Sequence, residues 1–162
     1  MKQAKNKLRS RRGVSLTEML TAVLVLSLVT LVVAAGVNSA TSVYRRSVAL
    51  SDAQTLSSTL SIALMDELRY ARDVETNGTA VTFTSNTFGE GVSVGTDADG
   101  QPGHLTVGGQ LLVGTGAYAL NFRADPAVSY DDSGTFHVTL SIYDQEETAV
   151  RTVDFSVTNL QK

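Results

Sequence analysis

The segment from Met19 to Val37 is nineteen residues long, carries no charged side chain and consists largely of Leu and Val. As an α-helix it rises about 1.5 Å per residue, so its length is about 28 Å, close to the thickness of the hydrocarbon core of a bilayer. The segment therefore predicts a helix that can span a membrane.

The charges are unevenly distributed on the two sides of this segment. Residues 1–13 hold six of the thirteen basic residues and none of the sixteen acidic ones, whereas residues 14–162 have a net charge of -9. Basic residues beside a membrane span stay in the cytoplasm, so the N-terminus is expected there and the acidic body on the other side. Because phosphate contacts need clustered Lys and Arg, no direct binding of nucleic acid is expected.

Length and cysteine content exclude several classes of protein. A chain of 162 residues has room for one modest folded domain, which argues against a multi-domain enzyme. The chain contains no cysteine. A disulfide framework, a thiolate nucleophile and a cysteine-ligated metal are therefore excluded.

Glu18 stands directly before the apolar segment and needs an explanation. A carboxylate costs up to about 3 kcal/mol at the centre of a membrane and less near its surface. One explanation is a capping box, because Ser15 and Glu18 have the S-x-x-E spacing that satisfies free amides at a helix start. The apolar segment itself fits a secretory signal peptide, with small residues at 33–36 for cleavage, or a permanent single-pass anchor.

A third interpretation comes from the residues around Glu18. The sequence RRGVSLTE at residues 11–18, followed at once by the apolar run, resembles the class III signal of type IV prepilins and pseudopilins. The resemblance covers about residues 9–37. It implies that residues 1–13 are a leader peptide, that a prepilin peptidase cuts after Gly13, and that Val14 becomes an N-methylated N-terminus. Glu18 would then be the acid at the fifth mature position, which serves assembly.

The physical reason for such an arrangement can be stated separately. Cleavage after Gly13 leaves an amine at the tip of an apolar helix, about one turn from Glu18. In a low-dielectric bundle of helices, opposite charges attract far more strongly than in water, and an unpaired charge is strongly disfavoured. Pairing Glu18 of one subunit with the Val14 amine of a neighbour would therefore penalise a wrong register.

Two positions differ from the common pattern of the family. Val14 stands where many members have Phe, and Ala35 stands where many major pilins have Pro. This favours a minor pilin or a pseudopilin in a type IV pilus, a competence pseudopilus or a secretion pseudopilus. The resemblance implies a prepilin peptidase, an assembly platform with its ATPase, and other pilin subunits as partners. It also implies a cytoplasmic-membrane location followed by a place in a surface pilus or pseudopilus.

Beyond residue 40 the sequence becomes amphipathic. Apolar residues recur at steps of three and four, which predicts a helix with one buried face that extends to about residue 73. The members of this stripe are Ala53, Leu56, Leu60, Leu64, Leu68 and Ala71. We expect residues 14–40 to form the membrane and assembly helix, residues 41–76 its amphipathic continuation, and residues 77–162 a β domain.

After Asn77-Gly78 the apolar residues alternate with polar ones, as in half-buried strands. Strands are expected around residues 81–83, 105–107, 118–122, 136–142 and 153–157, the last two joined as a hairpin through 144–148. Short turns between consecutive strands predict an antiparallel meander. The predicted fold is α+β and pilin-like, with a long N-terminal helix packed against one C-terminal antiparallel sheet.

The sequence also contains a literal G-x-S-x-G match at Gly91–Gly95, centred on Ser93. This motif works as a turn from a strand into a helix, with a His base later in the chain. Here turn-forming residues follow it, and His104 and His137 are the only two histidines. We interpret the match as a strand between glycine turns, so that no catalytic residue is expected, although a secreted hydrolase that uses Ser93 stays as a minor alternative.

Asp97 and Asp99 lie close together, as in calcium-binding loops. Counted from Asp97, Gly100 falls at position four and Gly108 at position twelve, whereas an EF-hand needs Gly at six and Glu at twelve. A solvated turn is expected, with a weak calcium site as the alternative. The acidic pairs at 131–132 and 146–147 are likewise expected in solvated turns, so no metal or cofactor is predicted.

Two functions from different classes remain for the chain as a whole. The first is a structural subunit of a filament, processed after Gly13 and assembled through its N-terminal helix. The second is a single-pass membrane protein whose extracellular β domain binds a ligand without polymerising.

Overall fold

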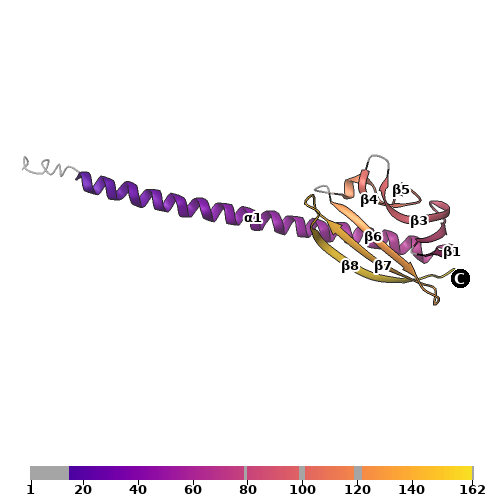
Figure 1. Ribbon diagram of the computed structural model, residues 1–162. Coiled ribbons are helices and arrows are strands. Elements are labelled where there is room, and N and C mark those ends of the chain that lie inside the picture. Colours follow the sequence, from indigo (N-terminus) through magenta and orange to yellow (C-terminus); the bar gives the residue numbers. More distant parts are fainter. Residues whose placement is uncertain (1–14, 79, 99–100, 119–121, 162) are drawn as a thin grey trace, which may run out of the picture. The chain divides into compact units, whose positions relative to one another are not determined.

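The computed structural model describes residues 15–78, 80–98, 101–118 and 122–161 (Figure 1). The chain divides into two compact units, Met1–Arg45 and Arg46–Lys162, and each unit is described by itself. Helix α1, Leu16–Arg69, begins in the first unit and ends in the second. The predicted leader, residues 1–13, lies outside the described residues, as does Val14.

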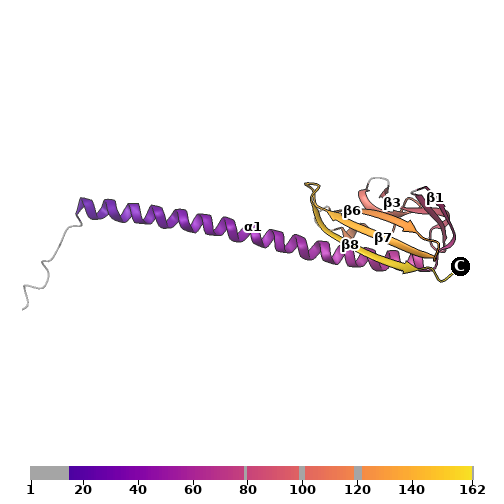
Figure 2. The same ribbon diagram turned by 60° about the horizontal axis from the view of Figure 1, so that its bottom comes forward.

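The strands of the second unit form two antiparallel sheets. Strands β1 to β5 make the first sheet in sequence order: β1 (Arg72–Asn77), β2 (Ala80–Ser85), β3 (Gly89–Ala98), β4 (Gln101–Val107) and β5 (Gln110–Leu111). Strands β6 to β8 make the second sheet, and Figure 2 shows them side by side: β6 (Arg123–Tyr130), β7 (Thr135–Tyr143) and β8 (Ala149–Thr158). The short helix η1, Thr115–Ala117, lies between the two sets in sequence. The α+β class is confirmed, but the prediction of one sheet is wrong.

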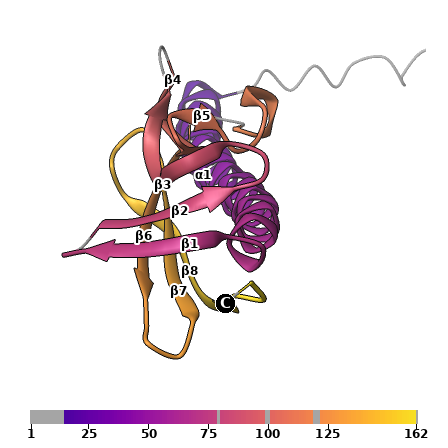
Figure 3. The same ribbon diagram turned by 90° about the vertical axis from the view of Figure 1, so that its right-hand side faces the viewer.

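The core of this unit lies between the two sheets and residues 46–69 of α1. Figure 3 shows both sheets on the same side of this part of the helix. The predicted helical stripe is confirmed from Ala53 to Leu68, where each member is at most 2% exposed; Ala71 is also buried but lies beyond the end of α1. The sheets contribute Phe83 and Leu105 from the first and Phe136, Leu140 and Ile142 from the second, all nearly fully buried.

The helix ends earlier than predicted. It stops at Arg69, and the residues expected to continue it to residue 76 form strand β1. Residues near the end of β8 bond to the end of the helix, since the Leu160 N–H donates to the carbonyl of Arg69, the last helical residue, at 3.0 Å, and the Asn159 side-chain amide donates to the Ala71 carbonyl just beyond it at 2.9 Å. Asn77 and Gly78, taken as the helix exit, instead lie at the connection between β1 and β2: Asn77 is the last residue of β1, paired with Ala80, and Gly78 follows in the turn with φ +67°.

The strand expected at 118–122 is also a correction. Tyr118 follows η1, residues 119–121 lie outside the described residues, and the strand begins at Arg123 as β6. The hydroxyl of Tyr118 accepts a hydrogen bond from the Leu105 N–H at 2.6 Å, so its ring is held under β4 rather than in a strand. Strand β6 was missed because Pro126 interrupts its pattern. A proline is tolerated there because β6 is the edge strand of its sheet.

Gly103 lies where β4 approaches β6. It has φ +77°, and a Cβ at this position would lie 2.8 Å from the Cβ of Arg123, closer than real Cβ contacts. Replacing Gly103 by Ala should therefore destabilise the domain by about 2–4 kcal/mol, from backbone strain and overpacking together. Urea unfolding of the full chain in detergent, followed by circular dichroism, measures this.

Gly109 is the matched control for this substitution. It has the same φ, +77°, but no atom lies within 4 Å of its added Cβ. Gly109→Ala should therefore show the backbone strain without the overpacking. Equal losses of stability in the two variants would contradict the close approach of β4 to Arg123.

Candidate functional site

The apolar segment at the start of α1 is the most unusual surface in the described structure. Its large apolar side chains, from Leu16 to Val37, are all more than half exposed within the first unit, with Val32 at 73% and Leu31 at 68%. They lie on every side of the helix. A helix that is apolar all round belongs in a membrane or in the middle of a helix bundle. By length and composition, this one can cross a membrane.

The few polar side chains inside this segment are satisfied by their own helix. The hydroxyls of Thr21, Ser27 and Thr30 donate to backbone carbonyls three or four residues earlier, at 2.8–2.9 Å. In lipid, a polar group without an internal partner costs several kcal/mol. The segment therefore needs no outside partner for these hydroxyls, whether lipid or another apolar helix surrounds it.

Glu18 lies in the first turn of the helix. The helix begins with the Met19 N–H donating to the Ser15 carbonyl at 3.0 Å, while the Ser15 hydroxyl lies 2.8 Å from the hydroxyl of Thr17. Across residues 15–161, where described, no hydrogen bond or ion pair joins the Glu18 carboxylate to another residue. The capping box with Ser15 is therefore not formed there. Gly13 and Val14, the predicted processing residues, lie outside the described residues.

The G-x-S-x-G match lies within a strand, as interpreted from the sequence. Ser93 is on β3, and the element that follows is β4 rather than a helix. Its neighbourhood is a groove of about 620 Å³ between β1–β3 and β6. The residues described as lining this groove include no histidine. The structure therefore does not bring Ser93 together with a base.

The two histidines lie in different sheets. His104, on β4, is 9% exposed and stacks on Tyr118 with ring centroids 3.8 Å apart. Burial lowers the pKa of His104 and raises that of Tyr118. His137, on β7, faces solvent as expected, and its Nε2 lies 3.1 Å from a carboxylate oxygen of Asp131. Neither histidine is placed for catalysis with Ser93.

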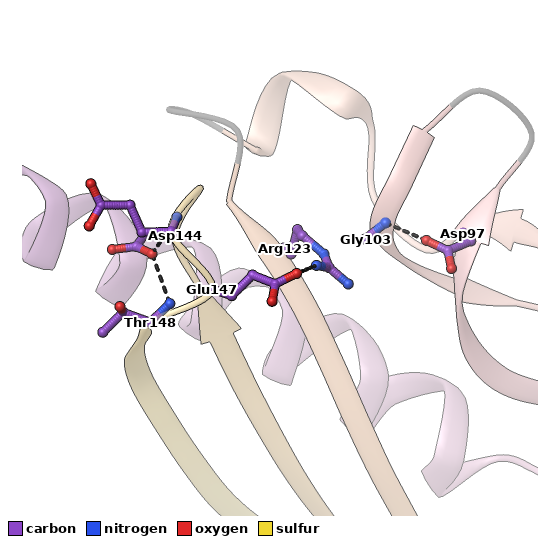
Figure 4. Close-up of polar contacts among 7 residues, drawn as sticks. Asp97, Gly103, Arg123, Asp144, Glu147 and Thr148 are labelled. Atoms are coloured by element: carbon purple, nitrogen blue, oxygen red, sulfur yellow. Dashed lines mark hydrogen bonds and ion pairs between the residues drawn. The ribbon is translucent and has the colours of Figure 1, made fainter.

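The acidic loops at Asp97 and Asp144 are held by hydrogen bonds to backbone amides (Figure 4). Asp97 accepts a hydrogen bond from the Gly103 N–H, and Asp144 accepts bonds from the Glu146 and Thr148 N–H groups at 2.9 Å. Arg123 and Glu147 form an exposed ion pair at 3.2 Å, of a kind that contributes little to stability. Within the described residues, no three His, Asp or Glu side chains lie close enough to hold a metal ion. Asp99 lies outside those residues.

Asp131 was expected in a solvated turn, but its carboxylate also makes specific contacts with the residues that follow it. Its carboxylate accepts hydrogen bonds from the Ser133 hydroxyl and the Thr135 N–H and contacts His137, which together hold the turn between β6 and β7. These bonds hold the pKa of Asp131 well below its usual value, and the bond from the Ser133 hydroxyl contributes most. The sequence signal that could have indicated this is the turn-forming run Asp131-Asp132-Ser133-Gly134.

This depressed pKa predicts an acid-sensitive turn. A carboxyl whose pKa is lowered by folding stabilises the fold fully above its unfolded value, 3.8, and loses that contribution as pH falls further. We expect Asp131→Asn to lower the free energy of unfolding at pH 6. The variant should also lose less of this free energy than the wild-type chain between pH 4 and pH 2. Urea midpoints of the full chain at these pH values measure it, with Asp132→Asn as the control. A decline equally steep in Asp131→Asn would contradict this role.

Comparison of the chain with protein-family models, with curated proteins and with solved structures found no match. The functional interpretation therefore depends on the residues of the chain itself. Of the processing and assembly residues predicted from sequence, the structure describes Glu18 and leaves Gly13 and Val14 outside the described residues.

Proposed function

We propose that this chain is a structural subunit of a type IV pilus-like filament, of the minor pilin or pseudopilin type. The observation that carries the proposal is the combination of an apolar helix at residues 19–37, whose large side chains are more than half exposed, and a carboxylate at its head, Glu18, that bonds to none of the described residues. A plain membrane anchor needs the apolar residues but gains nothing from the carboxylate, which lowers its affinity for lipid. A helix that must meet a second, positively charged helix tip needs both.

The positive charge in this proposal is the α-amino group of Val14. A prepilin peptidase cuts after Gly13 on the cytoplasmic side and removes six basic residues, and Val14 is then N-methylated. The amine of one subunit pairs with Glu18 of a neighbour in a low-dielectric bundle. Because an unpaired charge there is strongly disfavoured, the pair selects one register between neighbouring helices.

Before assembly, the subunit is a single-pass protein of the cytoplasmic membrane. Its basic N-terminus lies in the cytoplasm, and its acidic β domain lies outside, as the positive-inside rule requires. An assembly platform and its ATPase then move the helix from lipid into the filament, where sibling subunits replace the lipid. The apolar circumference of residues 19–37 suits both surroundings, since its hydroxyls are already satisfied.

The mature N-terminus tests the proposal directly. Mass spectrometry of the chain from host membranes and from sheared surface material should find a subunit that begins at an N-methylated Val14. An intact leader would instead support a membrane-anchored binding protein, and a start near residue 35 would indicate an exported domain. Either result contradicts the filament proposal.

A glycine pair provides the control for processing. Gly13→Val should leave the leader attached, because the residue before the cut changes shape. Gly36→Val, within the apolar segment, should leave cleavage unchanged, since no atom lies within 4 Å of its added Cβ. Normal cleavage of the Gly13→Val variant would contradict recognition at this site.

A further inference from the structure

A small hollow opens on the second unit where the first sheet meets the second. Its volume is about 290 Å³, close to that of the smallest pockets that hold small molecules, about 300 Å³. We name it the polar hollow. The described residues that line it are Thr96 of β3, Arg123, Ala124 and Asp125 of β6, Tyr143 of β7, and Glu147 of the turn between β7 and β8.

Strand pairing places three of these side chains on one face of the second sheet. Arg123 pairs with Tyr143 across β6 and β7, and Asp125 stands two residues further along β6. Side chains two residues apart in a strand, and those directly opposite in a neighbouring strand, point to the same face. Ala124, between the two β6 residues, is 1% exposed and belongs to the core. The backbone of the sheet therefore brings a guanidinium, a carboxylate and a phenol together.

The Arg123 side chain is held from two sides, as Figure 4 shows. Its Nη1 lies 3.2 Å from a carboxylate oxygen of Glu147, and its methylene groups lie against Gly103, where a Cβ would collide with them. A guanidinium has five N–H donors. Within the described ranges, the bond to Glu147 is the one hydrogen bond of this group, so donors remain for a ligand.

The turn that presents Glu147 has a backbone conformation that stability alone does not favour. Glu147 has φ +58°, in the left-handed region that a residue with a Cβ adopts rarely. Asp97, which follows Thr96 in the first sheet, has φ +71°. Residues in such conformations cluster at ligand sites, because the surrounding structure must hold them there. Their place beside the polar hollow therefore agrees with a binding role.

The charges of the polar hollow define the class of ligand that it fits. The carboxylates of Asp125 and Glu147 accept hydrogen bonds, whereas the guanidinium of Arg123 donates them. An anion would face two carboxylates and a cation would face the guanidinium, so part of the wall opposes either one. A hydroxyl group suits the whole wall, because it donates to a carboxylate and accepts from a guanidinium at the same time. A neutral molecule with several neighbouring hydroxyls therefore matches the hollow.

Tyr143 adds a half-buried aromatic ring to these polar groups. An aromatic ring has a flat apolar face, and that of Tyr also carries a polar hydroxyl at its edge. A sugar ring is complementary to this surface, since it has C–H groups on its faces and hydroxyls around its edge. A hollow of about 290 Å³ has room for about one such ring.

We propose that the polar hollow binds one ring of a neutral saccharide. Asp125 and Glu147 accept hydrogen bonds from its hydroxyls, and Arg123 donates to the hydroxyl oxygens. The ring of Tyr143 lies against a C–H face of the sugar. The hollow is open to solvent, so the rest of a longer saccharide extends outside it. This binding is additional to filament assembly and does not depend on it.

Ligand-detected NMR of the full chain tests the proposal. The probes are the methyl glycosides of glucose, galactose, mannose and N-acetylglucosamine. The chain is kept in dodecylphosphocholine micelles, because maltoside detergents carry the very groups under test. At least one glycoside at millimolar concentration should receive saturation transfer from the protein, most strongly at its ring protons. Absence of transfer to all of these glycosides would overturn the inference.

Two carboxylate variants locate the binding. Asp125→Asn keeps the shape of the side chain but replaces an acceptor oxygen by a donor, so it should weaken binding at least about tenfold. Asp154→Asn is the matched control, because Asp154 is exposed on the same face of the sheet but outside the hollow, and it should bind as the wild-type chain does. Unchanged circular dichroism confirms that both variants fold. Equal affinity of Asp125→Asn and the wild-type chain would overturn the inference.

Variants of Tyr143 and added salt test the kind of ligand. Tyr143→Phe keeps the ring and should keep most of the binding, whereas Tyr143→Leu loses the flat face and should lose at least about tenfold in affinity. Because the ligand is neutral, added sodium chloride should leave its affinity unchanged. Binding of acetyl-lysine-methylamide in place of every glycoside would indicate a site for a basic side chain and would overturn the inference. Since none of these measurements needs a filament, their failure leaves the proposed function standing.

Discussion

Replacing Glu18 by Ala should reduce the amount of assembled filament by about a hundredfold or more, while the chain remains in the membrane. In the assembly that we propose, the substitution would leave the Val14 amine of a neighbour unpaired in a low-dielectric bundle, and removing one partner of a buried ion pair costs about 3–5 kcal/mol. Since each 1.4 kcal/mol is about a tenfold change, this is a factor of about 10² to 4 × 10³. The ratio of chain in sheared surface material to chain in membranes measures the effect.

Two further variants make this result specific for the charge. Glu18→Gln keeps the shape and polarity of the side chain but loses its charge, so it should fail nearly as severely as Glu18→Ala. Thr21→Ala removes a hydroxyl one turn away that already bonds to its own helix, and it should assemble normally. If Glu18→Gln assembled as well as the wild-type chain, charge pairing would be the wrong explanation for the acid.

Replacing Phe136 by Ala should destabilise the β domain by about 3–5 kcal/mol, the usual cost for a fully buried aromatic residue. The ring of Phe136 is 0% exposed and joins the two sheets. It makes an edge contact with Phe83 of the first sheet, with centroids 6.2 Å apart, and lies 4.6 Å from the ring of Tyr130. Its loss leaves a cavity between the sheets.

Urea unfolding of the full chain in detergent micelles, followed by circular dichroism and tyrosine fluorescence, measures the change. Phe155 on the neighbouring strand is the matched control, because it packs against the same core but remains partly exposed. Phe155→Ala should therefore cost clearly less. Equal losses for Phe136→Ala and Phe155→Ala would contradict a core centred between the sheets.

Elements with a strong local pattern were predicted correctly. The buried stripe of α1 and the alternation in β7 and β8 depend on residues two to four apart, so the pattern is visible in any short window of sequence. The turn between these strands was also predictable, since Asp144 accepts bonds from residues only two and four positions later. His137 was placed correctly on the outer face for the same reason.

The errors come from contacts between distant parts of the chain. The end of α1 at Arg69 depends on Leu160, which is remote in sequence. Tyr118 leaves its expected strand because its hydroxyl binds the backbone of Leu105. Strand β6 forms despite Pro126 because its pairing with β7 supplies the register. None of these partners can be identified from a local pattern.

The candidate site shows the same division. The apolar run and Glu18 are local features, so the sequence alone indicated a helix for lipid or for other helices. Ile62 is 69% exposed, as the helical period indicates, because it stands two residues from both Leu60 and Leu64 and so lies away from the buried stripe. The tertiary structure decides which strands cover that stripe.

The identity and length of the apolar segment, the amphipathic stripe and most strands follow from the order of residues alone, because helix and strand periods are short-range properties of a chain. The division into two sheets and the end of the helix follow from tertiary packing. Each depends on which distant segment supplies a hydrogen bond or an apolar surface. Which segment supplies it depends on how the whole chain packs, so it cannot be read from a short stretch of sequence.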